Sequence, residues 1–229
     1  MCPHDGRASG QNGSIMDPLP LTAAPAAPVE RADAARNRER ILCAAARLFA
    51  ERGADNVSMD DVAELAGVGK GTLYRRFGDK AGLALSLLDE DDRRLQEAMI
   101  RGAAPLGPGA PARERLHAFG EAYLELLDRH SGLLAVAAEG GGLKSSPAWQ
   151  LYRTHLVVLL SDATPDGDAE LGAELLLDAL NPGSYRFRRA QGFEPARLAR
   201  GWRMLVDGWI AASTGEVPAP TRPAVAPAE

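Results

Sequence analysis

Apolar residues recur at a helical spacing along most of this chain. Residues three and four apart share one face of a helix, so apolar residues at this spacing predict an amphipathic helix. The stripe expected over residues 36–52 consists of Ile41, Leu42, Ala45, Leu48 and Phe49. Similar stripes cover residues 112–129, 147–161, 168–180 and 195–212. With no run of alternating β-branched residues, the pattern predicts an all-α fold of about eight or nine helices.

Stretches rich in Gly and Pro divide these helices. Residues 102–111 form one clear break, and residues 140–147 and 181–195 form two lesser ones. Residues 1–30 contain eight Gly or Pro, residues 215–229 contain five, and neither stretch has a helical or strand period. We therefore expect a disordered tail at each end.

Two short helices are expected within residues 57–78. Ser58 suits an N-cap, and Asp61, three residues later, completes a capping box. Val62 and Leu65 would be the buried face of the first helix, and Gly67 suits the left-handed turn that ends it. Two short helices joined by a Gly-containing turn are typical of a helix-turn-helix unit.

The second of these helices, residues 70–77, would bury Leu73 and Phe77 and expose a different set of side chains. The exposed set contains no acid and consists of Lys70, Thr72, Tyr74, Arg75 and Arg76. A helix N-terminus beside a Lys suits phosphate, and Thr and Arg reach base edges in a major groove. The pattern favours double-stranded DNA. The alternatives are a helical hairpin whose basic residues are only solvated, and a packing role for Tyr74.

Residues 38–83 resemble the TetR/AcrR family of bacterial transcriptional regulators. Many separate positions carry the resemblance: Ile41-Leu-x-Ala-Ala-x-x-Leu-Phe49, Gly53, Ser58, Val62-Ala63, Ala66-Gly67-Val68, Gly71-Thr72-Leu73-Tyr74, Phe77 and Lys80. The rest of the chain is similar to the family only in having helices of the expected lengths.

The resemblance implies a homodimer with a three-helix N-terminal helix-turn-helix head and a larger C-terminal helical bundle for ligand binding and dimerisation. It divides the chain into a head at residues 31–80 and a body at residues 81–214, between the two tails. Most family members repress transcription from a near-palindromic operator, and a small ligand in the body moves the two heads out of register. The alternative is a dimeric DNA-binding regulator with no small-molecule effector, controlled by a partner or by abundance.

The resemblance also implies which residues touch DNA. Ser58 and Lys80 are expected at phosphates, and Arg75 lies where the family varies and often recognises sequence. Arg36 and Arg38 would approach the DNA backbone ahead of the first helix. The full set is Arg36, Arg38, Ser58, Lys70, Gly71, Thr72, Tyr74, Arg75 and Lys80.

Two positions depart from the family pattern. Gly69 stands where Ser is common, which removes one phosphate contact but costs the helix cap only a few tenths of a kcal/mol. Gly82 stands where better helix formers are usual. We expect it to loosen the link between head and body by about 1 kcal/mol relative to Ala.

In the body, the resemblance implies which two helices line the effector pocket, and large aromatic residues on the last helix indicate the dimer seam. The pocket candidates are Phe119, Tyr123, Trp149, Tyr152 and His155, for a largely apolar effector. The seam candidates are Trp202, Leu205 and Trp209 on the last helix. The alternative for both sets is plain protomer core.

Charge and composition narrow the functional classes. The net charge is −5, but residues 31–80 carry +2 and residues 81–229 carry −5, so DNA binding would depend on a local basic patch. No apolar run exceeds six residues, which excludes a membrane span of about 20 and favours the cytoplasm. Cys2 and Cys43 make no disulfide framework, Cys2 and His4 make no metal site, and we expect no cofactor. No nucleotide-binding or hydrolase motif occurs, so we expect no enzyme.

Overall fold

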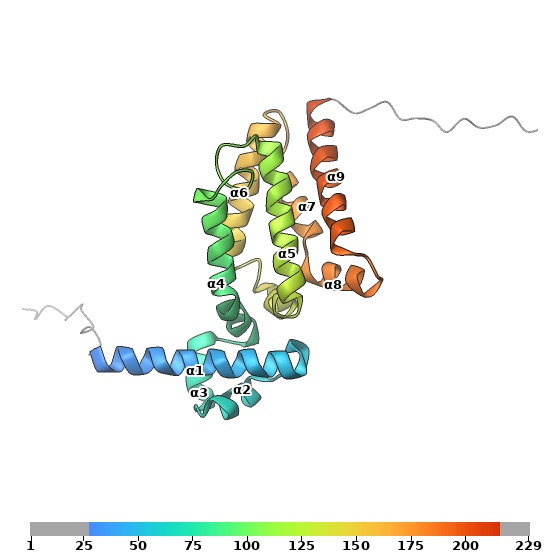
Figure 1. Cartoon of the computed structure of the whole chain (residues 1–229). Helices are drawn as coiled ribbons and strands as arrows, with labels where there is room; N and C mark the ends of the chain where they lie inside the picture. Colours follow the sequence, from blue (N-terminus) through green and yellow to red (C-terminus); the bar gives the residue numbers. More distant parts are fainter. Residues whose placement is uncertain (1–27, 216–229) are drawn as a thin grey trace, which may run out of the picture. The chain divides into compact units, whose positions relative to one another are not determined.

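The computed structural model describes residues 28–215, and this part of the chain is helical throughout its regular structure (Figure 1). Its elements are α1 (Pro28–Arg52), η1 (Ala54–Asn56), α2 (Met59–Ala66), α3 (Lys70–Phe77), α4 (Lys80–Arg101), α5 (Ala112–Ala138), η2 (Glu139–Gly141), α6 (Pro147–Ala163), α7 (Ala169–Ala179), α8 (Pro182–Ala190) and α9 (Pro195–Thr214). Residues 28–215 contain no strand, which confirms the predicted all-α fold. None of these helices is both long and apolar enough to cross a membrane.

The chain forms two compact units, residues 1–36 and residues 37–229, so the boundary falls within α1. Helix α1 begins at Pro28 rather than at residue 36. Most of both predicted tails, residues 1–27 and 216–229, lies outside the described residues, as do Cys2 and His4.

One predicted break is a helix. Residues 181–195 contain α8, which begins with Pro182 after Asn181, whose side chain accepts a hydrogen bond from the Ser184 backbone. Asn at the N-cap and Pro in the first turn are helix-start signals. They were hidden because α8 buries only Pro182 and Tyr185, so it has no apolar stripe.

Local sequence signals explain the ends of α2. The Ser58 side chain accepts from the Asp61 backbone and the Asp61 side chain accepts from Ser58, which confirms the predicted capping box. Gly67 ends the helix at φ 62°, ψ 40°, the left-handed conformation that glycine adopts without strain. The prediction was wrong for Leu65, which is 44% exposed because α2 turns Val62, Ala63 and Ala66 inward instead.

The helices of the N-terminal region share a core with the helices that follow. Ile41, Leu73 and other side chains of α1 to α3 are buried together with residues from later in the chain. The later residues are Leu83 and Ala84 of α4, and Val136 and Ala137 of α5. Cys43 of the same helix is exposed, because Ile41, Ala44 and Ala45 form the buried side of α1.

Helix α5 is the central helix of the second core and packs against α4, α6, α8 and α9 (Figure 1). Its backbone leaves helical geometry at His130 (φ −132°, ψ 23°), whose Nε2 lies 3.0 Å from Asp91 Oδ2. Gly120 of α5 lies flat against the Trp202 indole of α9: a Cβ here would come within 2.0 Å of the ring. These two helices can therefore approach closely only at a glycine.

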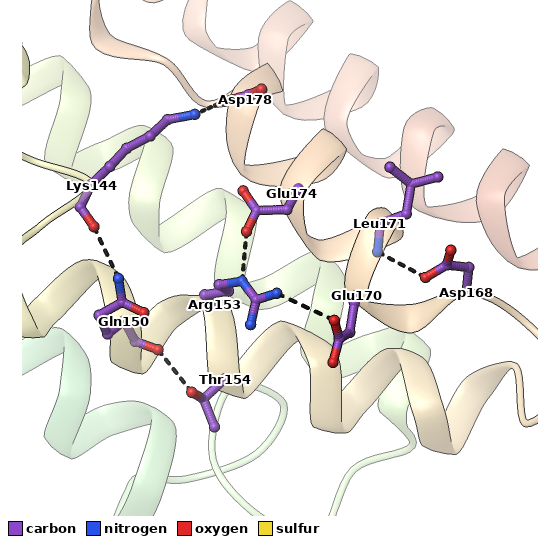
Figure 2. Close-up of polar contacts among 9 residues, drawn as sticks. All are labelled: Lys144, Gln150, Arg153, Thr154, Asp168, Glu170, Leu171, Glu174 and Asp178. Carbon is purple, nitrogen blue, oxygen red and sulfur yellow. Dashed lines mark hydrogen bonds and ion pairs between the residues drawn. The ribbon is translucent and has the colours of Figure 1, made fainter. Parts of the chain in front are cut away.

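Ion pairs join α6, and the turn that precedes it, to α7 (Figure 2). Arg153 of α6 reaches Glu174 at 2.5 Å and Glu170 at 3.7 Å, and Lys144 lies 2.9 Å from Asp178. Helix α7 buries Ala173, Leu176 and Leu177 against the rest of the core. Leu171 and Leu175 of the same helix are 50% and 52% exposed, so not every leucine in the stripe predicted over residues 168–180 faces the core.

The structure also corrects the expectation for Gly82 in the first turn of α4. A Cβ at this position would lie 2.1 Å from the backbone carbonyl oxygen of Phe77. The Gly82 backbone N–H donates to the Asp79 side chain at 2.8 Å, which caps α4. Gly82 is thus required for the tight passage from α3 to α4, and does not merely weaken the helix.

Candidate nucleic-acid interface

Helix α3 is held by one face and exposes the other. Leu73 is fully buried and Phe77 nearly so, as predicted. Tyr74 is 47% exposed, Arg75 is exposed, and Thr72 is partly exposed on the outer side. Buried anchors at positions 73 and 77 thus turn the predicted DNA-contacting side chains toward solvent.

The N-terminus of α3 leaves its backbone donors free of a side-chain cap. Gly69 is the N-cap residue in an extended conformation (φ −68°, ψ 140°) and supplies no side-chain hydrogen bond. The first N–H groups of a helix carry partial positive charge and are suited to a phosphate oxygen. A Cβ at Gly69 would meet nothing within 4 Å, so the approach to this end is open.

Two cations of the predicted set differ in their partners. Lys70 Nζ lies 2.6 Å from Asp60 of α2, and this hydrogen bond raises the pKa of Lys70. A phosphate at Lys70 would compete with that carboxylate. Arg75 has no acidic partner within 4 Å among residues 33–215. Its guanidinium can meet DNA without first breaking an ion pair.

The remaining predicted contacts are engaged in local structure. The Ser58 hydroxyl caps α2, and Lys80 Nζ lies 3.3 Å from the Asp55 carbonyl oxygen. Arg38 is partly buried, with its guanidinium 5.5 Å from the centre of the Phe77 ring and 3.7 Å from Asp89. Arg36 belongs to the first compact unit, where it pairs with Asp33. The DNA role of all these residues stays a prediction.

Sequence reasoning missed Arg40, which secures the end of α2. Its Nη2 donates to the Ala66 carbonyl at 2.6 Å and to the Gly67 carbonyl at 3.3 Å. A cation at the C-terminal end of a helix satisfies orphan carbonyls and favours the helix dipole. The partners are 26 and 27 residues away in the chain, so no local pattern marks Arg40.

The five predicted pocket residues pack largely on one another. Phe119 has ring contacts with Tyr123, Tyr152 and His155, at centroid distances of 6.0, 5.7 and 5.9 Å. Trp149 is also buried. The Tyr152 hydroxyl donates to Asp92 at 2.7 Å. His155 Nε2 has no hydrogen-bond partner in the described residues, and burial, with Arg115 nearby, lowers the pKa of His155 to about 4.

A cavity of about 360 Å³ lies elsewhere, between α5, α8 and α9. We call it the α8–α9 cavity. None of the five predicted pocket residues lines it, whereas two predicted dimer residues, Trp202 and Leu205, do. The sequence did not indicate this cavity. Part of its wall comes from residues 181–195, which the sequence pattern predicted to be a break between helices.

The structure separates the three predicted dimer residues. Trp202 is only 2% exposed, and its indole N–H donates to the Leu116 carbonyl at 2.9 Å, so it belongs to the protomer core. Trp209 is partly buried and packs against Gly172, where a Cβ would come within 2.6 Å of its ring. Leu205 alone of the three is exposed, at 51%. Leu205 is therefore the most accessible of the three to a partner subunit, and the dimer role of Trp209 and Leu205 stays a prediction.

Together, the capped α2, the Gly67 turn and the outward face of α3 define a helix-turn-helix domain. Residues 41–87 match the family described as "Bacterial regulatory proteins, tetR family". An HTH-type transcriptional regulator of Staphylococcus aureus (strain bovine RF122 / ET3-1) is 46% identical over 61 residues, which cover 27% of this chain and 33% of that protein. The match thus spans about a third of this relative.

Solved structures extend the likeness to the whole fold. A TetR-like transcriptional regulator from Rhodococcus sp. RHA1 is 26% identical with a TM-score of 0.52, over 76% of this chain and 96% of that one. The Bacillus subtilis regulator FadR, solved with stearoyl-CoA, is 21% identical with a TM-score of 0.54, over 74% and 98%. These findings confirm the resemblance to the TetR/AcrR family of bacterial transcriptional regulators: this chain carries that family's helix-turn-helix domain.

Proposed function

We propose that this protein is a dimeric transcriptional repressor that binds a near-palindromic DNA operator and is released from it by a small-molecule effector. The observation that carries the proposal is the outer face of α3: Tyr74 and Arg75 are exposed on its C-terminal half, and its N-terminus has no side-chain cap. In a major groove, such a helix would place Arg75 against a base edge and its N-terminus against a phosphate.

A second copy of the chain is needed because one α3 contacts only a few base pairs. Helix-turn-helix dimers place two recognition helices about 34 Å apart, on half-sites one DNA turn apart. Leu171 and Leu175 of α7 and Met204 and Leu205 of α9 are all at least half exposed, and we assign this apolar surface to the dimer interface. Exposed apolar surface of this kind is typical of interaction sites.

A small-molecule effector is supported by the body of the fold. FadR of Bacillus subtilis, which shares the fold, was solved with stearoyl-CoA, so a body of this architecture can accept a ligand. In this chain the described body holds both an aromatic cluster with an unpartnered His155 nitrogen and the α8–α9 cavity. Binding at either place would release DNA by changing the spacing of the two heads.

The proposal is tested with a DNA duplex that the wild-type protein selects from a random library. Arg75→Ala should weaken binding to that duplex by about 5- to 160-fold and relax preference at one position of each half-site, because a base-reading Arg contributes about 1–3 kcal/mol. Lys80→Ala should weaken binding to all sequences alike and reduce the salt slope by about 1 for each head. Fluorescence anisotropy at several salt concentrations measures both effects.

The matched control is Arg101→Ala, which removes an exposed cation at the end of α4 that pairs with Glu97. It should leave DNA affinity unchanged. If Arg75→Ala and Lys80→Ala both kept wild-type affinity at every salt concentration, α3 would not be the DNA-contacting element. Wild-type protein that selected no sequence from the library would contradict the proposed function as a whole.

A further inference from the structure

The α8–α9 cavity combines an apolar wall with positive charge. Its apolar lining includes Leu124 of α5, Leu180 before α8, and Trp202 and Leu205 of α9. Two arginines, Arg188 of α8 and Arg197 of α9, also line it. Its volume of about 360 Å³ is at the small end of the usual range of about 300–1,000 Å³ for ligand pockets.

These two guanidinium groups lack an acidic partner, unlike three of the four other arginines of α8 and α9. Arg186, Arg189 and Arg203 on the same two helices each pair with a carboxylate. Within residues 33–215, neither Arg188 nor Arg197 lies within 4 Å of one. Arg188 Nη1 reaches only the Ala179 carbonyl, at 3.4 Å, and the Arg197 guanidinium lies 4.2 Å from the centre of the Phe193 ring.

No acid lines the cavity, and the acids that contact Tyr185 or follow Phe193 in the chain are already engaged. Asp128 accepts from the Tyr185 hydroxyl at 2.6 Å and lies 3.4 Å from Arg189. Glu194 lies 3.6 Å from Arg189 as well. The charge left at the cavity by Arg188 and Arg197 is therefore positive, and it faces apolar walls.

We propose that the α8–α9 cavity binds an amphipathic anion, with its apolar body against Leu180 and Leu205 and its carboxylate or phosphate head on Arg188 and Arg197. Guanidinium groups pair with both anions through two parallel hydrogen bonds, and their planar fork favours them over a point charge. This proposal deepens the proposed function, because it gives the chemical class and the place of the effector.

The cavity is also connected to the helix-turn-helix region through α8. Two residues before Arg188, Arg186 reaches both carboxylate oxygens of Asp55 in η1, at 2.7 and 3.4 Å. Element η1 directly precedes α2. An anion that draws Arg188 into the cavity would act on the same nine-residue helix that contacts η1. Leu205, shared with the proposed dimer surface, also brings the ligand close to the second subunit.

The experiment uses the full-length dimer and decanoate as the probe, measured by isothermal titration calorimetry and by intrinsic tryptophan fluorescence, to which Trp202 in the cavity wall contributes. Decanoate should bind, whereas uncharged decanol and the cation decyltrimethylammonium should bind at least about tenfold more weakly. Inorganic phosphate alone, which has the head without the body, tests whether the apolar wall is needed. Decyl phosphate, compared with decanoate, shows whether the cavity binds a phosphate or a carboxylate head group more tightly.

Arg188→Gln and Arg197→Gln should each weaken decanoate binding by about tenfold or more, since a hydrogen bond to a charged group is lost. Arg200→Gln is the matched control: it is on the same helix and exposed, but outside the cavity lining. Equal binding of decanoate and decanol, or unchanged decanoate binding in both cavity variants, would overturn the proposal. So would decanoate binding seen only in a monomeric variant, because the partner subunit would then fill the cavity.

Measuring operator affinity with and without decanoate tests the ligand proposal separately from the proposed DNA-binding function. Saturating decanoate should reduce the operator affinity of the wild-type protein and leave that of Arg188→Gln unchanged. Failure to bind any operator would contradict the proposed function alone, because the calorimetric titration contains no DNA. Arg-dependent decanoate binding that left operator affinity unchanged would overturn the effector role of the cavity.

Discussion

At the scale of single residues, glycines account for much that sequence propensity leaves unexplained. Gly120 and Gly82 lie inside helices, where glycine ordinarily costs stability relative to alanine. The structure places Gly120 against an indole ring and Gly82 against a backbone carbonyl oxygen. In both cases the missing Cβ permits a close approach, which outweighs the helical preference.

We expect Gly82→Ala to destabilise the protein, although propensity alone predicts a gain of about 1 kcal/mol. The added Cβ would lie 2.1 Å from the Phe77 carbonyl oxygen, so the α3–α4 passage must shift. Overpacking of this kind costs about 1–3 kcal/mol. Denaturant unfolding, compared with the wild type, measures the change.

Gly71→Ala serves as the control, since this glycine is also in the first turn of a helix and a Cβ there meets nothing within 4 Å. It should be neutral or stabilising by up to about 1 kcal/mol. A stabilised Gly82→Ala protein would show that the passage tolerates a side chain.

At this scale, the sequence could predict the features that depend on residues close together in the chain. The capping box of Ser58 and Asp61 and the left-handed Gly67 follow from residues within a few positions. The roles of Arg40, Gly82 and Trp202 depend on groups brought close by folding, and in two of these cases the partners are 26 or more residues away. Such contacts cannot be inferred from one sequence without a fold.

At the scale of elements, the amphipathic stripes predicted which segments are helical better than which faces are buried. Helix α7 contains many leucines, so its sequence does not distinguish the face toward the core from the face toward a partner. Packing against α6 and α9 selects Leu176 and Leu177 for the core and leaves Leu171 and Leu175 outside. Helix α8 was missed because it has only a small buried face.

The exposed leucines of α7 give a direct test of the dimer surface. Leu175→Arg should shift the protein from dimer to monomer in sedimentation velocity, because a charge would be buried without a partner at the interface. The fold should survive, since Leu175 is 52% exposed in the protomer. Circular dichroism checks that the helical content is retained.

Ile100→Arg is the control, because Ile100 is similarly exposed, at 50%, but lies on α4. It should leave the dimer intact. A Leu175→Arg protein that sedimented as the wild type would place the interface on another surface.

At the scale of the molecule, the two cores are continuous. Leu85 and Leu133 pack against both, so a change in the body has a packed route to the helix-turn-helix region. The Arg186–Asp55 ion pair adds a second link across the same region. The hydrogen bond from Arg186 lowers the pKa of Asp55, so the pair stabilises the folded state at neutral pH and is lost when acid protonates Asp55.

Arg186→Gln should therefore loosen η1 and the start of α2. An exposed pair contributes about 0.2–1 kcal/mol, which corresponds to amide hydrogen exchange about 1.4- to 5-fold faster in residues 54–60. The difference from the wild type should be present at pH 7 and shrink as the pH falls through the pKa of Asp55. Exchange followed by mass spectrometry gives both results.

Arg153→Gln breaks a comparable pair, between α6 and α7, and should leave exchange in residues 54–60 unchanged. If both variants behaved alike, the Arg186–Asp55 pair would have no specific effect on the helix-turn-helix region.

The shared core restricts how such a protein can be recombined. A chimera that joined residues 1–80 of this chain to the body of a relative would set its three N-terminal helices on foreign residues at the positions of Leu83, Ala84, Val136 and Ala137. The chimera would keep the DNA-contacting surface of α3 but lose part of the core on which its three N-terminal helices pack. Exchanging DNA specificity between relatives therefore requires that these four residues be transferred as well. Two of them lie more than fifty residues beyond the junction at residue 80.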